Sequence, residues 1–335
     1  MSTIKDVAKI ANVAPSTVSS VLNQRITVRP GTYQKIMDAI EKTGYRANSI
    51  ARGLRMKETQ TLGLVLPTIL NPHYPQVAHG VEEYAGQRDY HVFLCNTERS
   101  SEKIHRHIHA LVNKGIDGII FYNTEVTPED FKFLKNQNVA VVTNYPVKAE
   151  WIDEVRINLR GAAKQMNAYL LSLGHRRIAL INGEKSQFRS KERLIGMRAA
   201  FREAGVVMDE SLVFYSDYSQ QFAYECARKF LSTANPPTCV FTTDHMAVAV
   251  LNAAFELRMR VPEDLSVAGF DQAVSIYPSL TTTQNSSEEV GRLLAEMAIQ
   301  RCQADEKPKK KIITVPSRIF VGKSTASPCI MPGAC

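Results

Sequence analysis

The sequence predicts an α/β protein in which a small all-α head precedes a large, two-lobed, doubly wound α/β body. Three observations support this prediction. Apolar residues repeat at helical spacing in the first 44 residues, short apolar strands alternate with amphipathic helices from residue 61 onward, and positive charge gathers at the start of the chain. Residues 1–60 hold ten basic and four acidic side chains, a net charge of +6, whereas the rest of the chain carries +2. A basic head on a nearly neutral body indicates that the head binds a polyanion.

Composition and the start of the chain narrow the class of protein. With 44% hydrophobic and 22% charged residues over 335 positions, the composition is that of a folded globular protein. The longest apolar runs are far shorter than the roughly 20 residues that span a bilayer, so we expect no membrane segment. The N-terminus lacks the apolar core of a secretory signal, and the six cysteines are scattered without C-x-x-C spacing. We therefore expect a protein of the reducing cytoplasm.

Three short helices are predicted in the head. Apolar spacing places the first from Ile4 to Ala11, the second from Pro15 to about Asn23, and the third from about Gly31 to Thr43, with Gly44 ending it. The outer face of the second helix is rich in small hydroxyl residues, which leave a slim, hydrogen-bonding surface suited to a groove. This arrangement is a helix-turn-helix. A generic three-helix cap is the alternative, and the basic charge of the same segment argues against it.

The body is predicted from its alternation of strands and helices. Strand-like runs begin near residues 61, 91, 118, 139, 177, 212, 239, 265 and 312, and amphipathic helices lie between many of them. Several helices end at a glycine, namely Gly115, Gly174 and Gly205. Because so many units exceed one compact sheet, we expect two similar lobes that face a cleft, with ligands bound beyond the carboxyl ends of the strands.

Motifs along nearly the whole chain resemble one known family. The segments that carry the resemblance include Thr3–Lys9, Val13–Asn23, Gly44–Tyr45, Asn48–Arg55, Gly115–Ile120, Leu173–Ile178 and Val261–Asp271. They resemble the lac repressor/gal repressor family of bacterial transcription regulators. The resemblance implies a homodimeric, effector-responsive repressor that binds a pseudo-palindromic double-stranded DNA operator, with a body similar to periplasmic sugar-binding proteins.

The resemblance also implies a division of the chain. We expect a DNA-binding domain over residues 1–46, a hinge helix and linker over 47–60, and an effector-binding and dimerisation domain over 61–335. Within that domain the first lobe is expected over about 61–159 plus 287–315, and the second over about 160–286 plus 316–335.

Eleven DNA-binding positions follow from the resemblance. In the family the second helix lies in the major groove, and the hinge helix forms on DNA with a leucine wedged into the minor groove. The matching positions are Thr3, Pro15, Ser16, Thr17, Ser19, Ser20, Asn23, Ala51, Arg52, Leu54 and Arg55. Alternatives stay open, because Thr17 and Ser19 also suit a solvated helix surface, and Leu54 also suits packing within the linker.

Eight effector-binding positions are predicted in the body. They come from the loop after the first strand and from the second lobe, and they are Asn71, His73, Tyr74, Gln187, Arg189, Arg193, Tyr218 and Asp271. Tyrosine faces, arginine forks and a carboxylate acceptor suit a sugar or sugar phosphate, with nucleobases as a second class. A simple ion pair between Arg193 and Asp271 is the structural alternative. The chain departs from the family at Ile157, where a polyol-binding carboxylate is usual, and at Gln187, where some relatives use arginine.

Two further motifs in the sequence do not indicate a metal site or a phosphate site. His105, His107 and His109 have metal-like spacing, but no further ligands are evident in the sequence, so a solvated helix surface is favoured. Gly322–Ser324 lacks the earlier glycine of a phosphate-binding loop. We expect no metal, no cofactor and no enzymatic activity. A sugar-binding protein without a DNA function is the alternative, and a cytosolic α/β enzyme is a third hypothesis without a recognisable catalytic motif.

Overall fold

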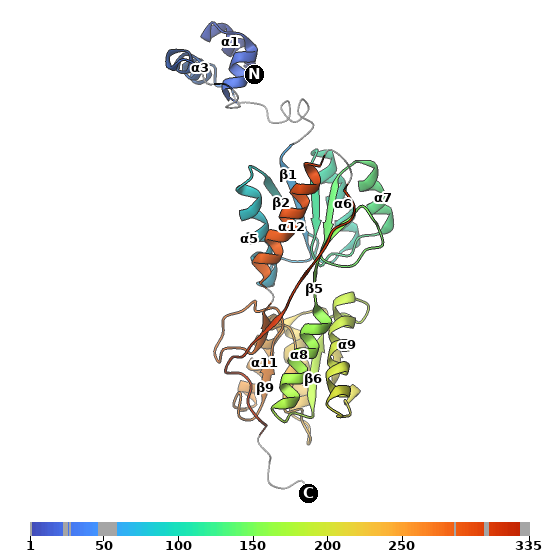
Figure 1. Cartoon of the computed structure of the whole chain (residues 1–335). Coiled ribbons are helices and arrows are strands. Elements are labelled where there is room, and N and C mark those ends of the chain that lie inside the picture. Colours follow the sequence, from blue (N-terminus) through green and yellow to red (C-terminus); the bar gives the residue numbers. More distant parts are fainter. Residues whose placement is uncertain are drawn as a thin grey trace. The chain divides into compact units, whose positions relative to one another are not determined.

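The computed structural model describes residues 2–22, 26, 28–45, 59–284, 286–304 and 308–328. The chain divides into two compact units, residues 1–59 and residues 60–335. Figure 1 colours them along the sequence. Among the described residues, no helix combines the length and apolar character needed to cross a bilayer.

The first unit contains three helices around a small core. They are α1 (Ile4–Ala11), α2 (Pro15–Leu22) and α3 (Pro30–Thr43). Both α1 and α3 end at a residue in the left-handed conformation, Asn12 (φ 52°) and Gly44 (φ 60°), which are residue types that tolerate it. The buried side chains come from all three helices: Val7, Ala8, Ala11, Val18, Val21, Ile36 and Ala39. The helices and the turn between α1 and α2 thus agree with the sequence prediction of a helix-turn-helix.

The first lobe of the body is built on a six-stranded parallel sheet in the order β11-β5-β4-β3-β1-β2. Its strands are β1 (Thr61–Leu66), β2 (His91–Asn96), β3 (Gly118–Phe121), β4 (Ala140–Thr143), β5 (Asp153–Ile157) and β11 (Ile312–Val315). Its helices are α5 (His73–Gly86), α6 (Ser101–Asn113), α7 (Pro128–Asn136) and α12 (Ser287–Cys302).

The second lobe contains a four-stranded parallel sheet in the order β7-β6-β8-β9. These strands are β6 (Ile178–Asn182), β7 (Val213–Tyr215), β8 (Cys239–Phe241) and β9 (Ser266–Ala268). Its helices are α8 (Leu159–Ser172), α9 (Phe188–Glu203), the short η1 (Glu210–Leu212), α10 (Gln220–Leu231) and α11 (Asp244–Glu256). An antiparallel pair is formed by β10 (Thr282–Gln284) and β12 (Arg318–Phe320).

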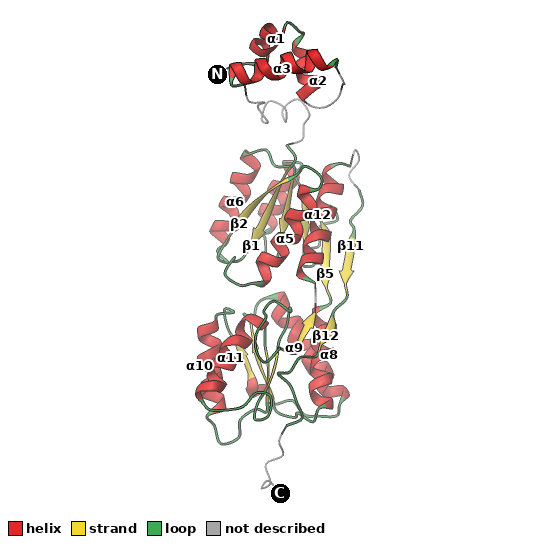
Figure 2. Cartoon of the chain, turned by 90° about the vertical axis from the view of Figure 1, so that its left-hand side faces the viewer, coloured by secondary structure: helices red, strands yellow, loops and turns green. Residues whose placement is uncertain are grey.

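The two lobes are interleaved along the chain. The chain passes from the first lobe to the second after β5, returns between β10 and α12, and crosses again between β11 and β12, as Figure 2 shows. Each lobe is therefore assembled from segments far apart in the sequence, and the crossing segments lie beside the space between the lobes.

Both sheets are covered by helices on both faces, as alternating side chains require. In the first lobe, Leu64 and Ile120 face α5 and α12, whereas Val65 and Ile119 face α6 and α7. In the second lobe, the same alternation divides the sheet between α8 with α9 and α10 with α11. This doubly wound α/β architecture in two lobes is the fold class that the sequence predicts.

Helices α5 and α12 pack closely because glycine stands at their contact. A Cβ added to Gly80 of α5 would lie 2.0 Å from the carbonyl oxygen of Glu288, and one added to Gly291 of α12 would lie 2.2 Å from that of Val77. At both points a glycine lies against a backbone carbonyl of the other helix, so the two helices lie closer than larger residues would allow.

Some elements differ from the sequence expectation. The loop expected over Asn71–Tyr74 is in part helical, because α5 already begins at His73. Strands β5, β10 and β12 have no counterpart among the predicted runs, because they mix polar and apolar residues; β5 reads Asp-Glu-Val-Arg-Ile. Their strand character comes from pairing with neighbours rather than from an apolar pattern.

Candidate functional site

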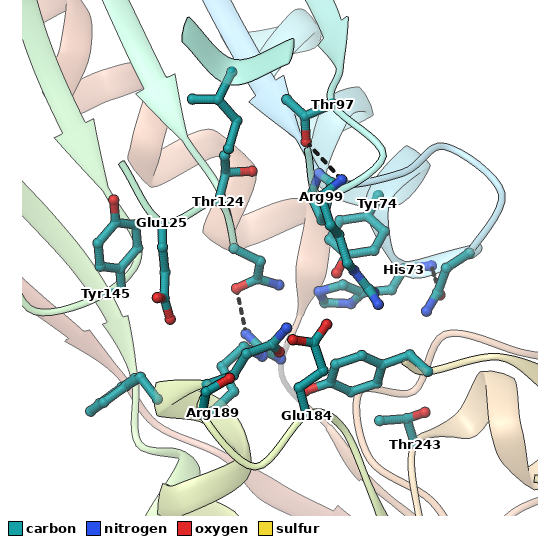
Figure 3. Close-up of a pocket in the computed structure, with 18 of the residues that line it drawn as sticks. His73, Tyr74, Thr97, Arg99, Thr124, Glu125, Tyr145, Glu184, Arg189 and Thr243 are labelled. Atoms are coloured by element: carbon teal, nitrogen blue, oxygen red, sulfur yellow. Dashed lines mark hydrogen bonds between the residues drawn. The ribbon is translucent and has the colours of Figure 1, made fainter. Parts of the chain in front are cut away.

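A cavity of about 230 Å³ lies between the two lobes, at the carboxyl ends of the strands (Figure 3). Residues that line it follow β1, β2, β3, β4, β6, β7, β8 and β9 along the chain. The structure brings all eight sequence-predicted effector positions to this one cavity: Asn71, His73, Tyr74, Gln187, Arg189, Arg193, Tyr218 and Asp271. Their role in binding stays a prediction.

On the first-lobe side, the start of α5 positions two aromatic side chains. The side-chain oxygen of Asn71 accepts a hydrogen bond from the backbone N–H of His73 at 3.0 Å, and its carbonyl accepts one from Tyr74 at 3.1 Å. Asn71 thus fixes the turn into the helix. His73 and Tyr74 then enter the cavity wall from the first helical turn, where Figure 3 shows them side by side.

His73 is buried in a polar triad. One ring nitrogen lies 2.9 Å from the hydroxyl of Tyr122, and the other lies 3.0 Å from the hydroxyl of Ser287 at the start of α12. Burial lowers the pKa of His73 from 6.5 to about 4; the nearby carboxylate of Asp271 raises this pKa, whereas Arg189 lowers it further. The imidazole is therefore neutral at physiological pH and links the cavity wall to α12.

On the second-lobe side, the start of α9 carries the cationic groups. Arg189 donates to the side-chain oxygen of Asn123 in the first lobe at 2.8 Å and lies 3.4 Å from the carboxylate of Asp271. Burial disfavours the charge of Arg189, but Asp271 and nearby tyrosines hold the pKa of this guanidinium above its ordinary value. Figure 3 shows Arg189, with its hydrogen bond to Asn123 as a dashed line. This side chain therefore joins the two lobes.

Arg193 does not form the ion pair with Asp271 that the sequence analysis gave as an alternative. Its guanidinium carbon lies 4.7 Å above the ring of Phe270, and one terminal nitrogen lies 3.4 Å from the hydroxyl of Tyr218. The carboxylate of Asp271 pairs with Arg189 instead. Arg193 is thus held by aromatic rings. Asp271 is oriented by Arg189.

Two cavity residues have left-handed backbone conformations. Tyr218 has φ 66° and Asp271 has φ 105°, a region that non-glycine residues rarely occupy. Such conformations persist only where the surroundings impose them, and they cluster at ligand sites. Gly183 makes room for one of them, because a Cβ there would lie 1.9 Å from the ring of Tyr218.

Several cavity residues were absent from the sequence prediction. They follow strand ends, and they include Thr97, Arg99, Asn123, Glu125, Glu184 and Thr243. Arg99 spans the cleft, since its guanidinium hydrogen-bonds the backbone carbonyl of Asp217 and lies 4.7 Å from the ring centre of Tyr218. The signal that could have found these residues is position, because each lies within a few residues of the carboxyl end of a parallel strand.

The charges that line the cavity are balanced. Among the described lining residues, three are arginines (Arg99, Arg189, Arg193) and three are carboxylates (Glu125, Glu184, Asp271). Within the described part of the chain, the Nε of Arg193 and the hydroxyl of Thr243 are buried without a hydrogen-bond partner. Buried polar atoms are normally paired, and both of these residues line the cavity.

The head presents hydroxyl groups along α2. Pro15 and Ser16 are exposed, and Thr17, Ser19 and Ser20 are half-buried, while Val18 and Val21 face the core. Because Ser16 and Ser20 are four residues apart, they share one face of the helix.

Thr3 has a structural role at the start of α1. Its backbone N–H and its hydroxyl both donate to the carboxylate of Asp6 at 2.8 Å. This contact stabilises the first turn of the helix. The other predicted DNA-binding residues lie outside the described residues: Asn23, Ala51, Arg52, Leu54 and Arg55.

Comparisons with known proteins match both units. Residues 3–48 match the bacterial regulatory proteins of the lacI family, and residues 167–325 match the periplasmic binding protein-like domain. Catabolite control protein A of Priestia megaterium is 32% identical over 329 residues, which cover 96% of this chain and 99% of the relative.

Two solved structures extend the comparison. The transcriptional regulator CelR in complex with cellobiose is 27% identical, has a TM-score of 0.72, and is covered over 97% of this chain and 100% of its own. The lac repressor dimer bound to operator and the anti-inducer ONPF has a TM-score of 0.83 at 23% identity, with 97% and 99% covered, which shows the fold alone.

A helix-turn-helix head joined to a two-lobed receptor with an internal cavity defines an effector-responsive, DNA-binding transcription regulator. The chain belongs to the lacI family of bacterial regulatory proteins, whose members in these comparisons are transcription regulators rather than enzymes.

Proposed function

We propose that the cavity binds a neutral sugar of about monosaccharide size, and that this sugar is the effector of a transcriptional repressor. The observation that carries the proposal is the balanced set of three arginines and three carboxylates around about 230 Å³. A site for a strong anion would need an excess of cationic groups, whereas equal numbers of cationic donors and carboxylate acceptors suit the hydroxyl groups of a polyol. The volume lies below the roughly 300–1,000 Å³ typical of sites for drug-sized ligands.

Each predicted residue has a defined part in this proposal. Asp271 accepts hydrogen bonds from sugar hydroxyls, and Arg193 donates to sugar oxygens through its unpaired Nε. Tyr74 and Tyr218 offer flat faces to the sugar ring. Gln187 and Asn71 complete the walls that also hold His73 and Arg189.

The DNA-binding part of the proposal concerns the head and the segment that follows it. Pro15, Ser16 and Ser20 face base edges, and Thr17, Ser19 and Asn23 contact phosphates. The segment with Ala51, Arg52, Leu54 and Arg55 forms the hinge helix on DNA, with Leu54 as the minor-groove wedge. The residue boundaries 1–46, 47–60 and 61–335 are part of this proposal.

We also propose that the protein acts as a homodimer in the cytoplasm and works by binding rather than by turnover. Two heads related by a two-fold axis suit a pseudo-palindromic operator. Closure of the lobes around the sugar changes the spacing of the two hinge segments, and a coupling free energy of about 1–3 kcal/mol suffices for regulation. The CelR complex with cellobiose supports a sugar as the effector class.

A thermal-shift screen tests the effector class. Purified full-length protein is mixed with neutral sugars, sugar phosphates and nucleobases, and a neutral sugar is expected to raise the midpoint of unfolding through mass action. Asp271→Asn should abolish that increase, because the carboxylate acceptor is lost. Asp264→Asn, whose carboxylate pairs with Arg260 on the surface of the same lobe, is the matched control and should retain it.

Two outcomes would contradict the proposal. Stabilisation by sugar phosphates or nucleobases with none by any neutral sugar would assign another effector class. An equal shift in the wild-type protein and in the Asp271→Asn variant would place the ligand elsewhere.

A further inference from the structure

A cluster of metal-ligating side chains lies between α6 and α7, outside the lining of the cavity. His105 and His109 stand four residues apart on α6, so they share one face of the helix, and Asp130 lies in the first turn of α7. One ring nitrogen from each histidine and one carboxylate oxygen all lie within 4.8 Å of one another. The sequence reveals only the helical histidines, whereas the fold supplies the carboxylate.

Each member of the cluster is held in place by a neighbour. The side chain of Asp130 is only 5% exposed; one of its oxygens lies 2.7 Å from Nδ1 of His105, and the other accepts a hydrogen bond from the hydroxyl of Thr127 at 2.9 Å. The ring of His109 stacks on Phe133 of α7, with ring centres 4.1 Å apart. A buried, oriented carboxylate beside two oriented imidazoles is the arrangement that metal sites use, including the second contact that aims the ligand.

We propose that His105, His109 and Asp130 bind a late first-row divalent metal ion, with Zn²⁺ as the reference ion. Zinc takes imidazole nitrogens and carboxylate oxygens at about 2.0–2.2 Å, which sets the donors of a tetrahedral site roughly 3.4 Å apart. The three donors already lie within 4.8 Å of one another, so binding of the ion would draw them closer together. Mg²⁺ and Ca²⁺ prefer ligand sets made of oxygen, so two imidazoles favour Zn²⁺, Ni²⁺, Co²⁺ or Cu²⁺.

Three protein ligands leave room for water in the coordination sphere. The exposed position of His105, whose side chain is 62% accessible, provides a path from solvent to that open side. A second group with suitable donors, His79, Glu83 and Glu288, has all three side chains exposed. It lacks the buried, oriented carboxylate, and it therefore serves as a comparison.

The metal ion would join two walls of the cavity. Ser101 and Ile104, in the first turn of α6, line the cavity, and Ile104 directly precedes His105. On the other side, the lining residues Asn123–Glu125 lead into α7, which carries Asp130. A bond from each helix to one ion would hold these walls at a fixed separation.

Equilibrium binding of Zn²⁺ to the untagged full-length protein tests the proposal. The wild-type protein is expected to bind one equivalent at this site. His105→Gln changes an exposed side chain and should weaken that binding more than about tenfold, since even loss of an outer-shell partner typically costs 10–100-fold. His107→Gln on the same helix and His79→Gln in the second group are matched controls that should bind as the wild type does.

A second measurement reports the location of the ion. Trp151, the single tryptophan of the sequence, packs edge-on against Phe131 of α7, with ring centres 6.5 Å apart. Co²⁺ should therefore quench tryptophan fluorescence in the wild type and in His107→Gln, and fail to do so at the same concentration in His105→Gln and Asp130→Asn. Absorption bands of Co²⁺ without thiolate charge transfer identify nitrogen and oxygen ligands.

Three results would overturn the proposal. They are no binding of Zn²⁺ by the wild-type protein, equal binding by wild type and His105→Gln, or thiolate bands in the Co²⁺ spectrum. None of these results depends on the identity of the effector, so the proposed sugar-binding function and the metal site fail or stand independently.

Discussion

Backbone conformation and side-chain packing are coupled at single residues of the cavity. Tyr218 keeps a left-handed backbone, its hydroxyl lies near Arg193 and Ser190, and its ring occupies the space that glycine at position 183 leaves open. Non-glycine residues in such conformations typically cost about 1–3 kcal/mol each. The cavity therefore holds its aromatic face in place at some cost in folding free energy, which suits a preorganised binding site.

His73 gives a pH-dependence at the residue scale. Its pKa is about 4 in the folded protein and 6.5 when exposed, so the unfolded chain binds the extra proton between these pH values. Stability therefore falls as pH drops from 6.5 toward 4. We expect His73→Gln to remove this loss of unfolding free energy. The loss amounts to at most about 3 kcal/mol, because each pKa unit between 6.5 and about 4 corresponds to 1.36 kcal/mol.

The measurement is urea unfolding of both proteins at pH 7.0 and pH 4.5. The comparison between them is needed because Asp244 acts in the opposite sense. Burial raises the pKa of Asp244 to about 7, the nearby Asp271 also raises this pKa, and the hydroxyl of Thr282 lowers it. Its protonation thus stabilises the fold as pH falls from 7 to 4. Parallel pH profiles for wild type and His73→Gln would refute the assignment of the acid-side loss to His73.

The sequence predicted which residues line the cavity better than it predicted which residues contact one another. All eight predicted effector positions line one cavity, because each follows a predicted strand or lies near the start of a predicted helix, as the resemblance to the family implies. Arg99 and Glu184 also follow strand ends, but no further feature of the sequence separated them from the other residues of those loops. The contact of Asp130 was not predicted either, because this residue lies 25 residues from His105 along the chain yet 2.7 Å from its ring.

At the scale of elements, the contact between α5 and α12 depends on glycine. Because a Cβ at position 80 would overlap a backbone carbonyl at 2.0 Å, the helices must separate to accept it. We expect Gly80→Ala to lower the free energy of unfolding by about 1–3 kcal/mol, the usual cost of overpacking. Urea unfolding at pH 7 measures the change.

Gly86 on the same helix is the matched control for this substitution. A Cβ at position 86 meets nothing within 4 Å, so Gly86→Ala should leave stability unchanged or raise it by up to about 1 kcal/mol through helix propensity. Equal effects of the two substitutions would show that helix contact does not decide the cost at position 80.

Regular elements with a clear apolar period were predictable, and short polar strands were not. Strands β1, β2 and β3 read as apolar runs, and each is close to its predicted bounds. The strand β5 carries Asp153, Glu154 and Arg156, which pair with Arg301, Lys310 and each other. Its place in the sheet depends on ion pairs across distant parts of the sequence, which no local pattern reveals.

At the scale of the whole molecule, the division into two compact units predicts that binding functions separate. A truncated protein that begins at Gln60 should keep the thermal response to the effector sugar and lose DNA affinity, because the basic head is missing. In full-length protein, the logarithm of DNA affinity should fall linearly with the logarithm of salt concentration. Gel-shift titrations with genomic fragments at several salt concentrations measure both effects.

Two results would be incompatible with this division of labour. The first is DNA affinity that survives removal of residues 1–59. The second is affinity of the full-length protein that is insensitive to salt, since contacts to phosphates release counterions on binding.

The interleaved lobes have a consequence for protein synthesis. Helix α12, which packs on α5, and the edge strand β11 both come from residues 287–315. They nevertheless complete the lobe whose first strand begins at residue 61. A nascent chain on the ribosome therefore cannot finish its first lobe until residues 287–315 have been translated. Val77 and Val81 of α5 stay without their cover for that period, so the growing polypeptide exposes an apolar surface of the kind that chaperones recognise.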